Sequence, residues 1–269
     1  MTKKASAPNT WWGRYEIPIG SCGAWTVGPM GIWIERLQGE WRVAYNATED
    51  HLDPTIRVQV PVEGMDLMSI DKVTRFAVTG EDPVVYLTPA LADRPIISRP
   101  DKPFVVLPKD EITVHLSTPL WIRIEVGEQR RLLLETPAFR PSDTWFGPDT
   151  TQGELCYAAR AAMQLNLEKV PLRAHRAITA VQVRNLGSEA LTVDRLNLPV
   201  VYLSLFLGAD DELWTENVVF ERPAGSEEFQ LRLRETAGRS SVRGAGAVGA
   251  PRKVIPDRVS VRALASLFS

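Results

Sequence analysis

The chain has 269 residues, of which 44% are hydrophobic and 24% charged, and its formal net charge is -2. This length suits two β-domains better than one small sandwich and buries enough surface to fold without disulfides or metal. The near-neutral balance argues against nucleic acid or an anionic membrane surface as the main partner, and no apolar run reaches the roughly 18 residues of a membrane span.

Cysteine usage bears on the compartment in which the protein works. Cys22 and Cys156 are single and far apart, and the N-terminal segment lacks the apolar run of a signal peptide. Two isolated thiols do not make a disulfide framework, so we expect a protein of the reducing cytoplasm. Residues 1–10 are predicted to be a flexible arm.

The first part of the chain is rich in aromatic residues separated by Gly and Pro. Turns are expected at Gly28-Pro29 and Gln38-Gly39, because these residues suit tight turns. The expected strands are 25–27, 31–37, 40–45, 56–62, 72–78 and 84–87, within an N-terminal β domain that spans residues 11–138.

Prolines punctuate residues 93–126 at a density that excludes helices and suits strand ends. Ile112, Val114 and Leu116 alternate with polar residues, and the even-numbered residues of 120–126 repeat this pattern. The alternation predicts two half-buried strands joined by a short bend at Thr118-Pro119. A further strand is expected at 132–134.

Residues 139–153 are polar and rich in Gly, Pro and Thr, which predicts a loop connecting two domains. A C-terminal β-sandwich domain is expected over residues 154–236. The start of this domain is ambiguous. The alanines of 158–162 favour a helix by propensity, whereas Leu165 and Leu167 alternate as in a strand, and we favour the strand.

The clearest strand pattern of the chain lies at 178–198. Two alternating runs flank the polar residues 185–188, which predicts a β-hairpin with one face in a core. The apolar run 198–207, which contains Pro199, is expected to be a buried strand. Further strands are expected at 217–221 and 228–233.

Residues 237–269 are predicted to form a flexible Gly/Ala-rich linker followed by a short tail. Val261, Leu264 and Phe268 have helical spacing, and one hypothesis is that they dock on a partner; a strand at 258–263 is an equal alternative. The expected fold is therefore all-β, with two β-sandwich-like domains, the second immunoglobulin-like, and a flexible C-terminal segment. Such a fold says little about activity.

Four stretches of the sequence carry a resemblance to a known family. They are PLWIRIE (119–125), WFGPDTTQGELCY (145–157), VRN (183–185) and LNLPVVYLSLF (196–206). With these motifs, the chain resembles a prokaryotic family of proteins of unknown function, DUF432, up to about residue 222. The resemblance implies no established activity, cofactor or catalytic residue. It does imply an association with mechanosensitive-channel genes, and hence a membrane-stress context.

Most catalytic chemistries lack a signal in the sequence. His51, His115 and His175 lie far from one another and from any Cys, so no metal site or cofactor is expected. Cys156 follows Gly-Glu-Leu in an expected strand and is more typical of a buried thiol than of a nucleophile. The glycines of 244–249 have dinucleotide-fingerprint spacing, but they follow no strand and open no helix, which indicates a linker.

A cluster of carboxylates provides the strongest argument for an enzyme. Asp143, Asp149 and Glu154 surround Trp145 and Phe146, and β-sandwich glycosidases use two carboxylates near aromatic rings. Asp is also favoured in turns for its own side-chain hydrogen bonds, and this structural role is the alternative that we favour.

The tryptophans provide an argument for a binding module. A sheet that presents several indole rings can stack sugars, and alternatively each ring fills the core, because each buries a large area. We favour the core interpretation. The candidate binding residues are Trp11, Trp12, Trp25, Trp33 and Trp145, with Trp41 as a further member of the N-terminal group.

Taken together, these patterns favour a non-enzymatic interaction or assembly protein of the cytoplasm, with a protein partner or a second copy of the chain. No nucleic acid and no membrane span are expected. The alternative is a carbohydrate-active enzyme or sugar-binding module that uses the tryptophans and the Asp143, Asp149 and Glu154 region.

Overall fold

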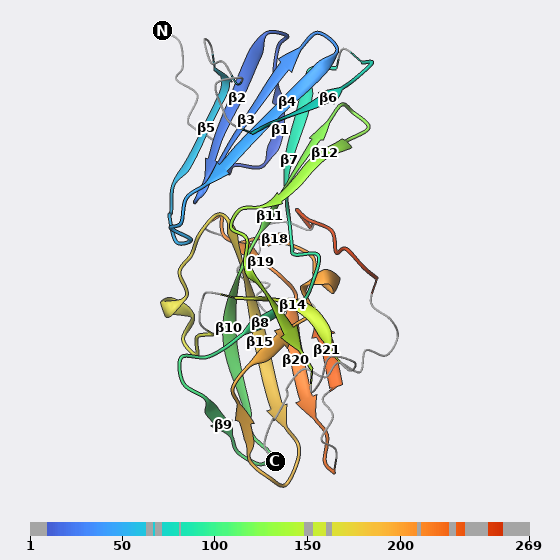
Figure 1. The fold of residues 1–269 in the computed structure, drawn as a ribbon. Helices are drawn as coiled ribbons and strands as arrows, with labels where there is room; N and C mark the ends of the chain where they lie inside the picture. The colour runs from blue at the N-terminus through green and yellow to red at the C-terminus, as the bar shows by residue number, and fades with distance from the viewer. Residues whose placement is uncertain are drawn as a thin grey trace. The chain divides into compact units, whose positions relative to one another are not determined.

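The computed structural model describes residues 10–62, 67, 72–80, 82–147, 153–159, 163–208, 211–225, 230–234 and 247–254. In these ranges the chain is all-β, apart from two short 3-10 helices (Figure 1). It forms two compact units. Unit 1 contains Met1–Pro89, Trp121–Phe139 and Arg173–His175, and unit 2 contains Ala90–Leu120, Arg140–Leu172 and Arg176–Ser269.

This division differs from the predicted one, in which residues 11–138 precede residues 154–236. The chain enters unit 2 at Ala90, returns to unit 1 at Trp121 and leaves it again at Arg140. The bend predicted at Thr118-Pro119 lies next to the second of these crossings. The alternation there predicts the strands correctly, but strand pairing, which decides the unit, leaves no local mark in the sequence.

Unit 1 contains a five-stranded antiparallel sheet whose strands match the predicted ones closely. Trp25 and Ile32 are directly opposed across two of these strands, as are Ile34 and Val43, and all four side chains are buried. They occupy one face because strand side chains alternate between faces. In spatial order the strands are β5 (Ile56–Val62), β2 (Ser21–Val27), β3 (Met30–Leu37), β4 (Glu40–Ala47) and β6 (Val73–Ala77).

The second sheet of unit 1 is four-stranded and completes a sandwich core. Ile122 and Ile124 are fully buried, as the predicted alternation requires. The ring of Tyr15 meets Trp25 of the other sheet edge-on, with centroids 5.2 Å apart. The strand order is β1 (Gly13–Glu16), β7 (Val84–Ala90), β11 (Trp121–Val126) and β12 (Arg131–Pro137).

Unit 2 is built around its longest strand, β15 (Arg176–Asn185). β10 (Glu111–Pro119) pairs antiparallel with β15 over residues 176–184, while β19 (Leu213–Trp214) and β20 (Asn217–Arg222) pair with it in parallel. β18 (Phe206–Leu207) and β21 (Gln230–Arg234) extend this sheet. The sheet therefore mixes parallel and antiparallel pairs, and its immunoglobulin-like character stays a prediction.

The remaining strands of unit 2 form two smaller sheets. The first is four-stranded, in the order β13 (Ser142–Phe146), β14 (Glu154–Ala158), β8 (Ile96–Ser98) and β17 (Leu196–Leu198). The second joins β9 (Phe104–Val106) to β16 (Leu191–Val193). β13 lies inside residues 139–153, so the predicted connecting loop contains a strand. β14 confirms a strand at the start of the ambiguous segment 154–170. The alternation at Leu165 and Leu167, on which the strand prediction relied, does not mark a strand, because Leu167–Lys169 is a 3-10 helix.

The hairpin predicted at 178–198 is wrong, although its strands are real. β15 pairs with β10, β19 and β20, whereas β16 pairs with β9 and β17 pairs with β8. Both edges of β15 are therefore already occupied by other strands. The buried side chain of Asn185, at the end of β15, donates hydrogen bonds to the carbonyls of Val106, Leu107 and Glu189 and directs the chain away.

The apolar run 198–207 is also not one strand. β17 ends at Leu198, and Pro199 is followed by a 3-10 helix, Val200–Tyr202. Proline fixes its own φ and lacks the N–H that a strand ladder needs. The backbone N–H of Leu205 then donates to the carbonyl of Gly249, and the backbone N–H of Arg252 donates to the carbonyl of Val201. These bonds hold residues 247–254, part of the predicted linker and tail, on unit 2. The predicted tail residues Val261, Leu264 and Phe268 lie outside the described residues.

Candidate functional site

The β13–β14 hairpin of unit 2 carries the sequence-predicted carboxylates and one predicted binding residue. Asp143 pairs with Tyr157, and Phe146 pairs with Glu154, in an unbroken antiparallel register. Side chains alternate along a strand, and directly opposed residues share a face. Asp143 and Glu154 therefore project from opposite faces of the hairpin and cannot flank one glycosidic bond. Asp149 lies outside the described residues.

One face of this hairpin is packed, whereas the other is exposed at Trp145 and Leu155 and buried at Tyr157. Phe146 and Cys156 are buried with Ile97 in a small apolar cluster. On the opposite face, Trp145 and Leu155 oppose each other directly, and they are 42% and 45% exposed. Two large apolar side chains thus lie side by side at the surface.

The indole of Trp145 lies close to the hairpin backbone at Gly153. A Cβ atom at this position would lie 2.4 Å from Nε1 of Trp145 and 2.6 Å from the carbonyl oxygen of Phe146. Only glycine leaves room for the ring to lie so close. The close approach therefore restricts the positions that the ring can take.

Charged groups lie on the same face, next to Trp145 in sequence and register. The carboxylate of Asp143 lies 3.2 Å from Arg94 and 3.4 Å from Arg140. Arg94 also lies over the ring of Tyr157, whose hydroxyl donates to Asp93 at 3.0 Å. Burial, and then the Asp93 carboxylate, raise the pKa of Tyr157, so the phenol keeps the proton that it donates. The positive charges of Arg94 and Arg140 therefore balance the negative charges of Asp93 and Asp143.

The tryptophans of unit 1 are mainly core residues. Trp11 is fully buried, and its Nε1 donates to the carbonyl of Ala174 at 2.8 Å; Trp25 and Trp41 are also buried. Trp12 is half-buried and meets Trp11 edge-on. Trp33 is half-buried against Leu67, Cys22 and Ala44. These rings do not form an exposed platform, because the sandwich needs their large apolar area inside.

The two thiols are protected from ionisation. Burial raises the pKa of Cys22 to about 11, with Glu35 adding to the shift. Burial likewise raises the pKa of Cys156 to about 12, with Glu154 adding to it. A thiolate is the reactive form, so neither environment activates a nucleophile.

The structure brings two of the histidines together, but through a backbone carbonyl and not through both rings. His175 is buried, with Nε2 3.1 Å from the carbonyl of His51, and burial lowers the pKa of His115. Among the described residues, no three His, Cys, Asp or Glu side chains are grouped so that they could hold a metal ion. The helices in the same ranges include none that is long and apolar enough to cross a membrane.

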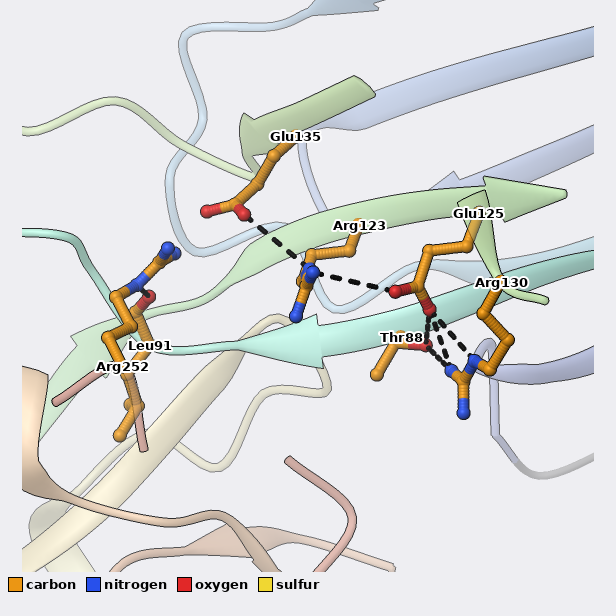
Figure 2. A network of polar contacts seen from close by, with 7 residues as sticks. All are labelled: Thr88, Leu91, Arg123, Glu125, Arg130, Glu135 and Arg252. Atoms are coloured by element: carbon orange, nitrogen blue, oxygen red, sulfur yellow. Dashed lines mark hydrogen bonds and ion pairs between the residues drawn. The ribbon is translucent and has the colours of Figure 1, made fainter. Parts of the chain in front are cut away.

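A polar network on unit 1 has no counterpart in the sequence analysis (Figure 2). The carboxylate of Glu125, which is buried, accepts from Arg130 at 2.7 Å and from Thr88 at 3.2 Å. Arg123 lies 3.5 Å from Glu125 and 3.6 Å from Glu135. The alternation along β11 predicts that Arg123 and Glu125 lie on the face opposite Ile122 and Ile124. It does not predict which side chains they contact. Figure 2 also draws a contact of unit 2, in which Arg252 donates to Leu91 at 2.7 Å.

No curated protein and no solved structure matches the chain. The motifs described above resemble the DUF432 family, and they lie on β10, β11, β13–β15 and β17. A family model described as a protein of unknown function (DUF432) matches residues 11–267, and the chain therefore belongs to this family.

Proposed function

We propose that this chain is an assembly protein that pairs with a second copy of itself through the exposed part of the β13–β14 hairpin. The observation that carries the proposal is the exposed pair Trp145 and Leu155, at 42% and 45% exposure on directly opposed positions. Aromatic anchors of this kind dominate the free energy of protein interfaces.

The charged rim favours a second copy over an unrelated partner. Arg94 and Arg140 lie beside Asp93 and Asp143, next to the apolar pair on the side of Asp143 and Tyr157. A two-fold interface brings the same surface together twice, so it must complement itself. A rim with two cations and two carboxylates meets this requirement, because each cation of one copy can face a carboxylate of the other.

The position of Trp145 is also suited to binding. Its ring lies close to Gly153, so less side-chain freedom is left to lose on association. Loss of rotamer freedom costs about 0.5–1.5 kcal/mol for each immobilised side chain. A ring that is already restricted reduces that cost.

The test is the association state of the full chain measured by sedimentation equilibrium. We expect a dimer, and we expect Trp145→Ala to raise its dissociation constant by about 30-fold or more, as for an interface anchor. Leu155→Ala should also raise the dissociation constant of the dimer. The matched control is Ile19→Ala, a similarly exposed apolar residue (48%) in unit 1, which should leave the dimer unchanged.

A chain that stays monomeric at about 100 µM would contradict the proposal, since stable interfaces of ordinary size associate well below that concentration. Equal weakening by Trp145→Ala and Ile19→Ala would also contradict it, because the effect would then not belong to the hairpin. The cytoplasmic location and the membrane-stress association remain expectations from the sequence.

A further inference from the structure

Unit 1 contains a pocket of about 340 Å³, at an end of the sandwich where several strands begin or end. It lies between the start of β4, the segment that follows β6, and the turn between β11 and β12. Its size is at the lower end of small-molecule sites, so it fits one small molecule. Its lining includes Trp41, Val78, Val126, Asp82, Gln129 and Arg131.

Asp82 shapes the pocket through its carboxylate. One oxygen accepts from the backbone N–H of Val84 at 3.0 Å, and the other from that of Glu128 at 2.9 Å. Asp82 therefore ties the β11–β12 turn to the start of β7. A carboxylate offers about four lone-pair sites, so two acceptor positions remain for a ligand.

The other polar groups of the lining are available for binding. In the part of the chain that the structure describes, the side chains of Arg131 and Gln129 make no hydrogen bond or ion pair, although the backbone of Arg131 pairs with Val126. The carboxylate of Glu128 is engaged elsewhere, 3.3 Å from the hydroxyl of Tyr86 and 3.5 Å from Arg14. Two carboxylates, on Asp82 and Glu128, and two guanidinium groups, on Arg131 and on Arg14 beside the lining, therefore lie at or next to the pocket.

We propose that this pocket binds an uncharged, polyhydroxylated molecule the size of a monosaccharide. Balanced charges favour a neutral ligand over an ion. The lining offers acceptors on Asp82 and donors on Arg131, and a hydroxyl group can serve both. Half-buried Val78 supplies an apolar contact for such a molecule's C–H groups, whereas Trp41 and Val126 are buried beneath the pocket. This ligand site is separate from the hairpin surface and independent of self-assembly.

The experiment is saturation-transfer-difference NMR of the full chain with glucose, galactose and mannose as probes. We expect saturable binding of at least one probe with a dissociation constant on the order of 1 mM, as for a small ligand. Arg131→Ala should weaken it by about tenfold or more, through loss of a charge-assisted hydrogen bond. The matched control is Arg99→Ala, an exposed arginine of unit 2 that should change nothing.

A second variant tests the pocket itself rather than one contact. Thr79 is an exposed lining residue, and Thr79→Trp places a large ring at the pocket, so binding should be lost while the protein stays folded. No saturable binding of any probe at about 100 mM would overturn the proposal. Binding that survives both Arg131→Ala and Thr79→Trp would overturn it as well, and so would binding of acetate or inorganic phosphate in place of the sugars.

Discussion

The amide nitrogen of Asn185 donates to the carbonyl oxygen of Val106, 79 positions away in the chain, at 3.1 Å. The same nitrogen lies 2.7 Å from the carbonyl oxygen of Glu189. The side-chain oxygen of Asn185 accepts a hydrogen bond from the backbone N–H of Gly187. One buried side chain therefore joins the end of β15, the segment after it and the end of β9. These bonds explain why the chain after Asn185 does not fold back on β15.

Replacing Asn185 with alanine should destabilise unit 2 markedly. Buried carbonyls would lose their donor, and each buried group left unsatisfied costs about 1–3 kcal/mol. We expect Asn185→Ala to lower the free energy of unfolding by about 3 kcal/mol, measured by urea denaturation. Asn46→Ala, at an exposed position of β4, is the control and should have an effect near zero. Similar losses for both variants would show that the hydrogen bonds of Asn185 contribute little.

Gly28 should not tolerate a side chain. Its φ is +59°, and a Cβ atom there would lie 2.2 Å from Nδ1 of the buried His175 ring. Gly28→Ala should cost about 3 kcal/mol, because strain and steric overlap add. Gly20 has a φ of +80° with nothing within 4 Å of such an atom. Gly20→Ala should cost only about 1 kcal/mol. Thermal unfolding compares the two, and equal costs would contradict the contact with His175.

The Glu125 network should respond asymmetrically to substitution. Removing Arg130 leaves a buried carboxylate with fewer partners, whereas removing the charge of Glu125 leaves Arg130 half exposed to water. We expect Arg130→Ala to cost about 2 kcal/mol and Glu125→Gln less. The left-handed φ of 51° at Arg130 is equally unfavourable for alanine, so it does not bias the comparison. A double-mutant cycle should give a coupling of at least about 1 kcal/mol, and strict additivity would argue against the contact.

Alkaline pH should destabilise the chain through its buried thiols. The pKa of Cys156 is raised from 9.0 to about 12, so ionisation opposes folding. Its contribution to stability is complete below pH 9 and is lost as the pH rises toward the raised value. The melting temperature of Cys156→Ala relative to that of the wild type should therefore rise between pH 9 and about pH 12, the ordinary and the raised pKa of Cys156. A constant difference over this range would contradict the shifted pKa.

The sequence alone determined the class of the fold and most strands. Alternation of apolar and polar residues, as at Ile122 and Ile124, is a local signal, and it identified β2 to β7, β10 to β12 and β20 correctly in type and near position. The aromatic content of the sequence also made Trp145 a candidate binding residue, and the structure leaves it 42% exposed, unlike the core interpretation that we favoured for the tryptophans. The family resemblance was equally a property of the sequence.

Only the tertiary structure decided which strands pair and which side chains meet. The crossing between units at Leu120 and Trp121 and the separation of β16 from β15 depend on contacts with strands far away in the chain. Asp143 and Glu154 are close in sequence, yet the register of β13 and β14 places them on opposite faces. Alternation specifies which face a residue takes within its own strand. It does not specify the neighbouring strand, because every strand offers the same backbone hydrogen bonds.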